Sequence, residues 1–164
     1  MAVDMTLVID GIEGETQKSQ WESEGGIDLE DWSWNMTQSG TTHDGTGGGS
    51  GRCNVGDINF TKRVDKASAD LIKACVTGKH IPKAELHVQK ADGDEQMEYF
   101  RIEMKIIIVS SYTTGAGKGD DDTVFENLSL NFREFKVVYT QQDETGAKSG
   151  ENEVAYDIAQ SKLV

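Results

Sequence analysis

The chain has 164 residues and a formal net charge of −13, from 16 Lys or Arg and 29 Asp or Glu. This balance argues against a general nucleic-acid binder, which needs a basic surface, and against docking on anionic lipid. Since no run of about 20 apolar residues is present, we expect no membrane insertion. The N-terminus lacks the basic start and apolar stretch of a secretory signal peptide. We therefore expect one domain over residues 1–164, made in the cytoplasm and, if exported, released without a cleaved signal.

Alternating apolar and polar residues predict strands in the first third of the chain. They are expected at residues 4–10, 27–38 and 54–64. In the second strand the apolar positions change parity at Glu30-Asp31, and a period of two permits this only with a bulge or bend. The side chains expected to point inward from the third strand are Ile58, Phe60 and Val64.

The second strand carries two tryptophans that point the same way. Trp32 and Trp34 share one face, while Ser33 and Asn35 share the other. We expect the tryptophans to belong to the core. The small polar residues between them are then expected to line a wet surface that contacts a partner.

One helix is predicted, over residues 66–77. Its apolar stripe consists of Ala67, Leu71, Ala74 and Cys75, at the spacing of one helix face. Asp65 is expected as the N-cap and Gly78 as the left-handed residue that ends the helix. Because the helix is short and apolar on one side, it should lie against a sheet.

Strands resume after the helix, at residues 83–90, 96–113, 123–141 and 154–158. In the third of these the alternation shifts at Arg133-Glu134, which predicts a kink. The inward face of the second is expected to carry Phe100, Ile102, Met104, Ile106 and Ile108. Seven or eight strands and one helix predict a mainly β fold, a two-sheet β-barrel or sandwich with a flanking helix.

A glycine-rich segment at residues 39–51 separates the second and third strands. It contains nothing that could anchor a core, so a long mobile loop is expected, and loops of this length are often functional. It is not a phosphate-binding loop, since it ends Gly51-Arg52-Cys53 without the Gly-Lys-Ser/Thr that grips phosphate.

The chain offers no constellation for catalysis, a cofactor or a metal. Cys53 and Cys75 have no CxxC partner and are expected to be free, partly buried thiols. His43, His80 and His87 are not spaced as metal ligands, so solvated or structural roles are expected. We therefore expect a protein that is not an enzyme.

The residues nevertheless resemble a known family, the haemolysin-coregulated proteins (Hcp) of bacterial type VI secretion. The likeness covers nearly the whole chain in order, and its specificity lies in the ordered set rather than in one motif. The segments that carry it are Met1-Ala2-Val3-Asp4-Met5, Trp32-Ser33-Trp34, Gln38-Ser39-Gly40, Phe60-Thr61-Lys62, Asp65-Lys66, Ala74-Cys75, Gly78-Lys79-His80, Glu98-Tyr99, Val109-Ser110-Ser111 and Asn127-Leu128-Ser129-Leu130-Asn131-Phe132.

The resemblance implies a structural function. Members of the family form a two-sheet β-barrel with a flanking helix, and six copies assemble into a ring with a wide lumen. The rings stack into a tube inside a contractile sheath, and the tube is released from the cell. The implied partners are further copies of the chain, sheath and spike proteins, and small effector proteins in the lumen.

The resemblance also implies two functional regions. The family's extended loop falls on residues 39–53, and its contact segment with the adjacent subunit or ring is expected at Gly45, Thr46, Gly47, Gly48, Gly49, Ser50 and Gly51. Ser33 matches a position on the lumen wall, and Asn35 would share that surface, so both are candidates for cargo contact. Two alternatives remain open, a monomeric β-barrel that carries a small ligand and a phage-derived tail-tube protein.

Overall fold

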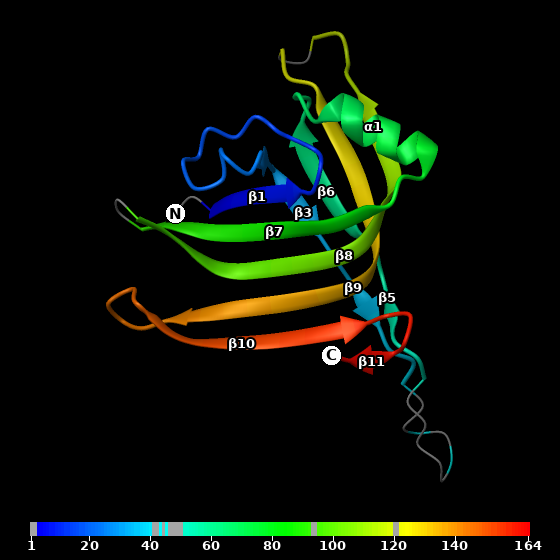
Figure 1. Cartoon of the computed structure of the whole chain (residues 1–164), viewed down its shortest axis with the longest axis vertical. Helices are drawn as coiled ribbons and strands as arrows, with labels where there is room; N and C mark the ends of the chain where they lie inside the picture. Colours follow the sequence, from blue (N-terminus) through cyan, green and yellow to red (C-terminus); the bar gives the residue numbers. More distant parts are fainter. Residues whose placement is uncertain (1–2, 41–42, 44, 46–50, 93–94, 120–121) are drawn as a thin grey trace.

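The computed structural model describes residues 3–40, 43, 45, 51–92, 95–119 and 122–164 (Figure 1). Over these residues the chain is mainly β with one α-helix, which confirms the predicted fold class. Its elements are β1 (Val3–Ile9), β2 (Ile27–Asp28), β3 (Asp31–Ser33), β4 (Met36–Thr37), β5 (Asn54–Val55), β6 (Ile58–Arg63), α1 (Ser68–Thr77), β7 (Ile81–Asp92), β8 (Glu95–Gly115), β9 (Phe125–Gln142), β10 (Lys148–Asp157) and β11 (Lys162–Leu163).

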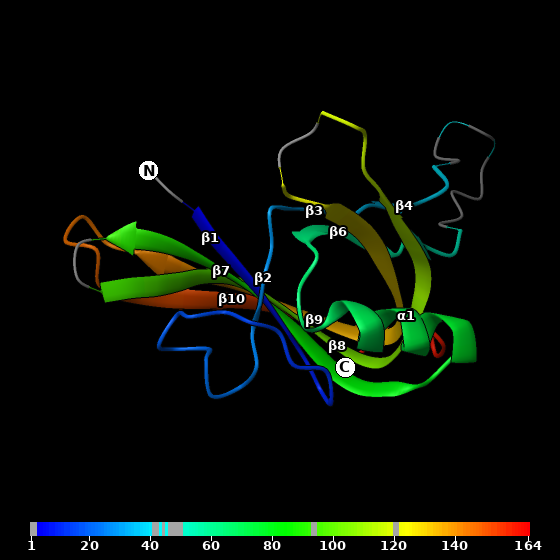
Figure 2. The ribbon, with the colours of Figure 1, turned by 90° about the horizontal axis from the view of Figure 1, so that it is seen from above.

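The architecture depends on two long strands, β8 and β9, that pair with each other along most of their length. The main sheet has the order β11-β10-β9-β8-β7-β1-β2, with β6 paired to β9 and β3 paired to β6. The first part of β9 pairs with β6, and its last part pairs with β10. Because the strands bend between these parts, the sheet folds into two layers over one core (Figure 2).

The strand pairs among the described residues do not close into a complete barrel, in contrast to the expected one. The chain itself joins the two edges, because β2 pairs with β1 and β3 pairs with β6. Between them the Leu29 N–H donates to the Met5 carbonyl at 3.0 Å, and the Glu30 N–H donates to the Thr61 carbonyl at 2.8 Å. The interruption predicted at Glu30-Asp31 is therefore the point at which the segment changes partner.

A left-handed residue reverses the inward face of β8. Ile106 has φ 55° and is 47% exposed, a conformation that is a genuine outlier for a β-branched residue. Beyond it Ile107 and Val109 are buried, so the prediction that Ile106 and Ile108 point inward was wrong. The change predicted for β9 at Arg133-Glu134 is confirmed, since the side chains on either side of this pair, Phe132 and Phe135, are both buried.

Helix α1 packs against the sheet through Leu71 and Ala74, both buried. The helix begins at Ser68 with Ala67 as N-cap, so the prediction that Asp65 caps it was wrong. The Asp65 carboxylate instead accepts a hydrogen bond from the Ala67 N–H at 2.9 Å, ahead of the first helical turn. Gly78 ends the helix with φ 62°, as predicted, because glycine adopts this conformation without steric cost.

Two further predictions need correction. Strand β10 begins at Lys148 rather than at residue 154, because polar residues such as Glu151 pair with β9 despite their lack of an apolar pattern. On β6 the third inward side chain is Lys62, which is fully buried, whereas Val64 is 49% exposed. The strand keeps its period of two, but a charged residue occupies the inward position.

The segment of residues 13–26, here called the strap, covers a buried histidine on β7. His87 is 3% exposed and stacks on Trp21 with ring centroids 3.9 Å apart. Its two ring nitrogens lie 2.7 Å from a Glu98 oxygen and 3.1 Å from a Glu85 oxygen. Burial lowers the pKa of His87, but the hydrogen bonds with both carboxylates outweigh it and raise that pKa above 6.5. Of the solvated and structural roles expected for the histidines, His87 has the structural one.

The carboxylates around His87 are themselves paired. Lys83 lies 2.6 Å from Glu85, and Arg101 lies 2.9 Å from Glu98. The hydrogen bond with His87 is the main cause that lowers the pKa of Glu85 from 4.5 to about 2. The stability that His87 supplies is therefore complete below about pH 6.5 and is lost as the pH rises through its folded-state pKa. The contribution of Glu85 is present above pH 4.5 and is lost toward pH 2.

We predict that His87→Gln lowers the free energy of unfolding by about 1–3 kcal/mol near pH 5.5. The difference from wild type should shrink as the pH is raised toward about 9, because the wild-type imidazolium then loses its proton. Urea unfolding at both pH values measures this, with the exposed His80→Gln as control. A difference that stays constant or grows with pH would contradict the assignment.

Candidate functional site

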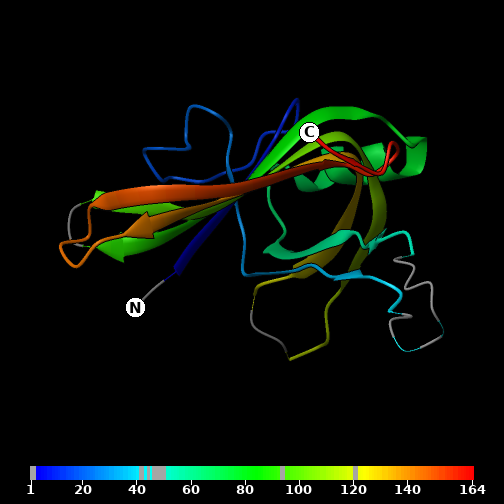
Figure 3. The same ribbon diagram turned by 90° about the horizontal axis from the view of Figure 1, so that it is seen from below.

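A polar surface, here called the polar face, covers the outer side of β3, β6 and the parts of β9 and β8 that lie in the same layer. The strand register aligns Ser33, Asn59, Ser129 and Ser111 in one row. Asp31, Thr61, Asn127 and Thr113 form the next row. All eight side chains are short and polar, and Figure 3 shows β3 and β6 on the side of the molecule away from β10. The face is therefore hydrophilic.

Hydrogen bonds hold much of the polar face in place. The Asp57 carboxylate accepts from the Ser110 hydroxyl at 2.6 Å and from the Asn131 amide at 2.8 Å. The Ser129 hydroxyl shares hydrogen bonds with those of Ser110 and Ser111. One row farther along, the Thr61 hydroxyl donates to the Asn127 side-chain oxygen at 2.7 Å. These bonds across strands fix side chains that would otherwise sample several rotamers.

The predicted faces of residues 32–35 are confirmed in the structure. Ser33 and Asn35 are exposed, while Trp32 and Trp34 pack against the core. Trp32 stacks on Phe100 with centroids 5.8 Å apart, and the Trp34 indole N–H donates to the Gly56 carbonyl at 2.9 Å. Ser33 lies in the polar face itself. Asn35 lies just beyond it, where its carbonyl accepts from the Gly56 N–H.

The loop candidates lie mostly outside the described residues, which include only Gly45 and Gly51 of residues 45–51. Both are exposed, and Gly45 has φ 81°. The two ends of the loop meet where β4 pairs with β5. A Cβ at Gly51 would overlap the Ser39 hydroxyl, so a larger residue would fit here only if the Ser39 side chain rotated away.

A buried ion pair supports the polar face from behind. Lys62 and Glu126 face each other on β6 and β9, and neither side chain is exposed. Lys62 also lies 2.8 Å from Asp65, and the Ser68 hydroxyl donates to Glu126 at 2.6 Å. The Tyr112 hydroxyl donates to the other Glu126 oxygen, and its burial together with this bond raises the pKa of Tyr112 to about 12. The network joins β6, β8 and β9 to the start of α1.

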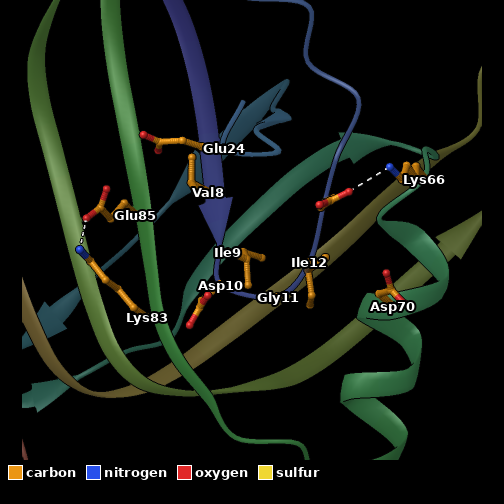
Figure 4. Close-up of a pocket in the computed structure, with 11 residues that line it drawn as sticks. Val8, Ile9, Asp10, Gly11, Ile12, Glu24, Lys66, Asp70, Lys83 and Glu85 are labelled. Carbon is orange, nitrogen blue, oxygen red and sulfur yellow. Dashed lines mark hydrogen bonds and ion pairs between the residues drawn. The ribbon is translucent and has the colours of Figure 1, made fainter. Parts of the chain in front are cut away.

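A separate pocket of about 610 Å³ lies where the end of β1, the strap, α1 and β7 meet (Figure 4). Its charged lining is Asp10, Glu13, Glu24, Lys66, Asp70, Lys83 and Glu85. Both lysines pair with carboxylates of the lining, Lys66 with Glu13 at 3.1 Å and Lys83 with Glu85 at 2.6 Å. The two lysines are therefore paired within the pocket, and Asp10, Glu24 and Asp70 are further carboxylates of its lining.

The remaining candidate groups are scattered. Cys53 and Cys75 are free and half-buried, as predicted. Within the described ranges, no three His, Cys, Asp or Glu residues are grouped as metal ligands. Among the same residues, no helix is long and apolar enough to cross a membrane.

Comparison with known proteins gives the same family as the sequence motifs. A family model described as "Type VI secretion system effector, Hcp" matches residues 6–139. The chain belongs to the Hcp family. The expectation from the sequence is confirmed, and the chain is accordingly a secreted protein of type VI secretion.

Individual Hcp proteins are similar over nearly their whole length. Protein hcp1 of Pseudomonas aeruginosa is 46% identical over 150 residues, which cover 92% of this chain and 91% of that protein. The crystal structure of Hcp1 from Salmonella typhimurium is 32% identical, with a TM-score of 0.80 over the full length of both chains. A solved "type six secretion system protein" has a TM-score of 0.91 at 24% identity, covering 99% of this chain and 100% of that one, and shows the same fold.

We predict that Lys62→Met lowers the free energy of unfolding by about 3–5 kcal/mol, because it leaves the Glu126 carboxylate buried without its partner. The double variant Lys62→Met/Glu126→Gln should recover part of this loss. Urea unfolding measures both.

The neighbouring Arg63→Met supplies the matched control. Arg63 pairs with Glu30 at 3.0 Å, but both side chains are exposed, so its loss should cost at most about 1 kcal/mol. Equal effects of Lys62→Met and Arg63→Met would show that burial of the pair is unimportant.

Proposed function

We propose that the chain is the structural subunit of a type VI secretion tube, in which six copies form a ring and the rings stack. Membership of the Hcp family over residues 6–139 carries this proposal. In this role the chain acts as a single domain over residues 1–164 and as a structural protein rather than an enzyme. The assembly would form in the cytoplasm, meet sheath and spike proteins there, and leave without a cleaved signal.

The packing of the interior favours this role over a small-ligand carrier. Large apolar side chains from both layers meet between the sheets, among them Leu7, Phe60, Leu86 and Met104, each at most 1% exposed. A carrier of this size would need that interior for its ligand. The surface, rather than the interior, is therefore the place where this chain meets its partners.

The polar face supports a role as the wall of the tube. A conduit that passes proteins needs a wall that contacts them without holding them tightly, and short hydroxyl and amide side chains bonded to one another meet this need. In the proposed ring this face lines the lumen. Ser33 and Asn35 then contact small effector proteins, and the loop at residues 45–51 contacts the neighbouring ring.

We predict that native mass spectrometry of the purified chain will show a dominant species near 6 × 18.0 = 108 kDa. A persistent 18.0 kDa monomer would contradict the ring.

We also predict that deleting residues 45–51 leaves this species intact and reduces the stacking of rings into longer tubes, which electron microscopy measures. A deletion variant that stacks like wild type would contradict the role of the loop.

We predict that Ser33→Gln weakens binding of a co-expressed effector by roughly tenfold, about 1.4 kcal/mol, because a long side chain then projects from the proposed wall. Co-purification and the cellular half-life of the effector measure the effect. Ser19→Gln is the matched control, since Ser19 is exposed in the strap rather than on the polar face. Effector binding unchanged by Ser33→Gln would remove Ser33 from the contact surface.

A further inference from the structure

The polar face carries negative charge that no basic side chain balances. Asp31 is exposed, and among the described residues its carboxylate has no hydrogen bond or ion pair. Among the described residues, the Asp57 carboxylate accepts hydrogen bonds only from the neutral Ser110 and Asn131 side chains. Such bonds fix the carboxylate in place and leave its charge uncompensated.

The basic residues of these strands are directed elsewhere. Lys62 points inward and pairs with Glu126 and Asp65. Arg63 reaches the outer side at the end of β6, where it pairs with Glu30 at 3.0 Å. No other Lys or Arg occurs in the described residues 31–33, 58–63, 109–114 and 125–131. The centre of the face therefore offers acceptors and negative charge.

The face also lacks the apolar anchors of a hydrophobic docking surface. Its one large exposed apolar side chain among those strand segments is Phe125, 42% exposed at the edge. The Arg63 guanidinium lies 5.9 Å from the centre of that ring and partly covers it. Apolar partners therefore find little surface to bury, and recognition depends on charge and hydrogen bonding.

We infer that the polar face selects cargo proteins whose contacting surface is basic, rich in Lys or Arg, over acidic ones. The inference rests on the proposed tube function and adds the chemical class of the cargo. With two carboxylates per chain, a ring of six copies presents twelve toward the lumen. Because this attraction acts between solvated charges, it weakens as salt is added, which keeps the contact reversible.

The test uses one small helical bundle made in two forms, with a lysine-rich and with a glutamate-rich surface. Binding of each labelled bundle to the assembled chain is measured by fluorescence anisotropy at low salt and at about 0.15 M salt. At low salt the lysine-rich bundle should bind at least about tenfold more tightly than the glutamate-rich bundle. This difference in affinity should become smaller as the salt concentration rises. In the Asp31→Lys variant, binding of the lysine-rich bundle should be about tenfold weaker than in wild type.

Glu22→Lys is the matched control, because it changes the charge from −13 to −11, as Asp31→Lys also does, but on the exposed surface of the strap. It should alter binding by less than about twofold. If Asp31→Lys and Glu22→Lys weakened binding of the lysine-rich bundle equally, the inference would be overturned, since net charge alone would then explain binding. Equal binding of both bundles by hexameric rings would overturn the cargo class and leave the tube proposal standing. Absence of hexamers would overturn the tube proposal itself.

Discussion

The pairing of β8 with β9 is the constraint on which the rest of the structure depends. One part of β9 serves the layer with β6, and the other serves the layer with β10, so a single ladder belongs to both layers. On both strands the buried positions change parity between these two parts, from Met104 to Ile107 on β8 and from Phe132 to Phe135 on β9. Ile106 makes this change on β8 by adopting a left-handed conformation, and β9 makes it opposite, at Arg133-Glu134. Without this paired reversal, one layer would direct its apolar side chains toward solvent.

The same constraint explains why the polar face and the buried ion pair lie back to back. On β6 and β9, outward positions carry Thr61 and Asn127, while the inward positions next to them carry Lys62 and Glu126. The inward charges lie near the end of the layer, where α1 covers them and Ser68 and Tyr112 complete their hydrogen bonds. Stability of the layer and chemistry of its surface thus reside in different side chains of the same two strands.

Much of this arrangement could be predicted because it is local. Alternation located the long strands, and the apolar stripe with Gly78 located α1. The faces of Ser33 and Trp34 followed from parity alone. The family could be inferred from the ordered motifs because they are short runs of neighbouring residues, which need no knowledge of how distant segments meet. Apart from the local N-cap at Asp65, the failures have a common physical cause, because they depend on contacts between distant segments. Nothing near Ile106 signals a left-handed residue, since the conformation is imposed by the two layers.

Long-range contacts also decide which polar residues are buried. The burial of His87 requires Trp21, which lies 66 positions away in the strap. Lys62 and Glu126 did carry a signal, as opposite charges at inward positions of two apolar strands. That signal can be used only once β6 is known to pair with β9.

Charge connects the surface to the proposed assembly. Six copies would carry a formal charge of 6 × −13 = −78, so assembly must place complementary groups at the contacts or rely on screening by salt. The polar face adds to this charge instead of reducing it, although uncharged Ser, Thr and Asn side chains could have occupied Asp31 and Asp57 as they do the neighbouring positions. The Asp31 and Asp57 carboxylates, set among otherwise neutral side chains, oppose assembly because they add to the repulsion between negatively charged copies. In the proposed ring their cost is offset if they attract something basic, so the charge of this face favours contact with a basic cargo over contact with neighbouring copies.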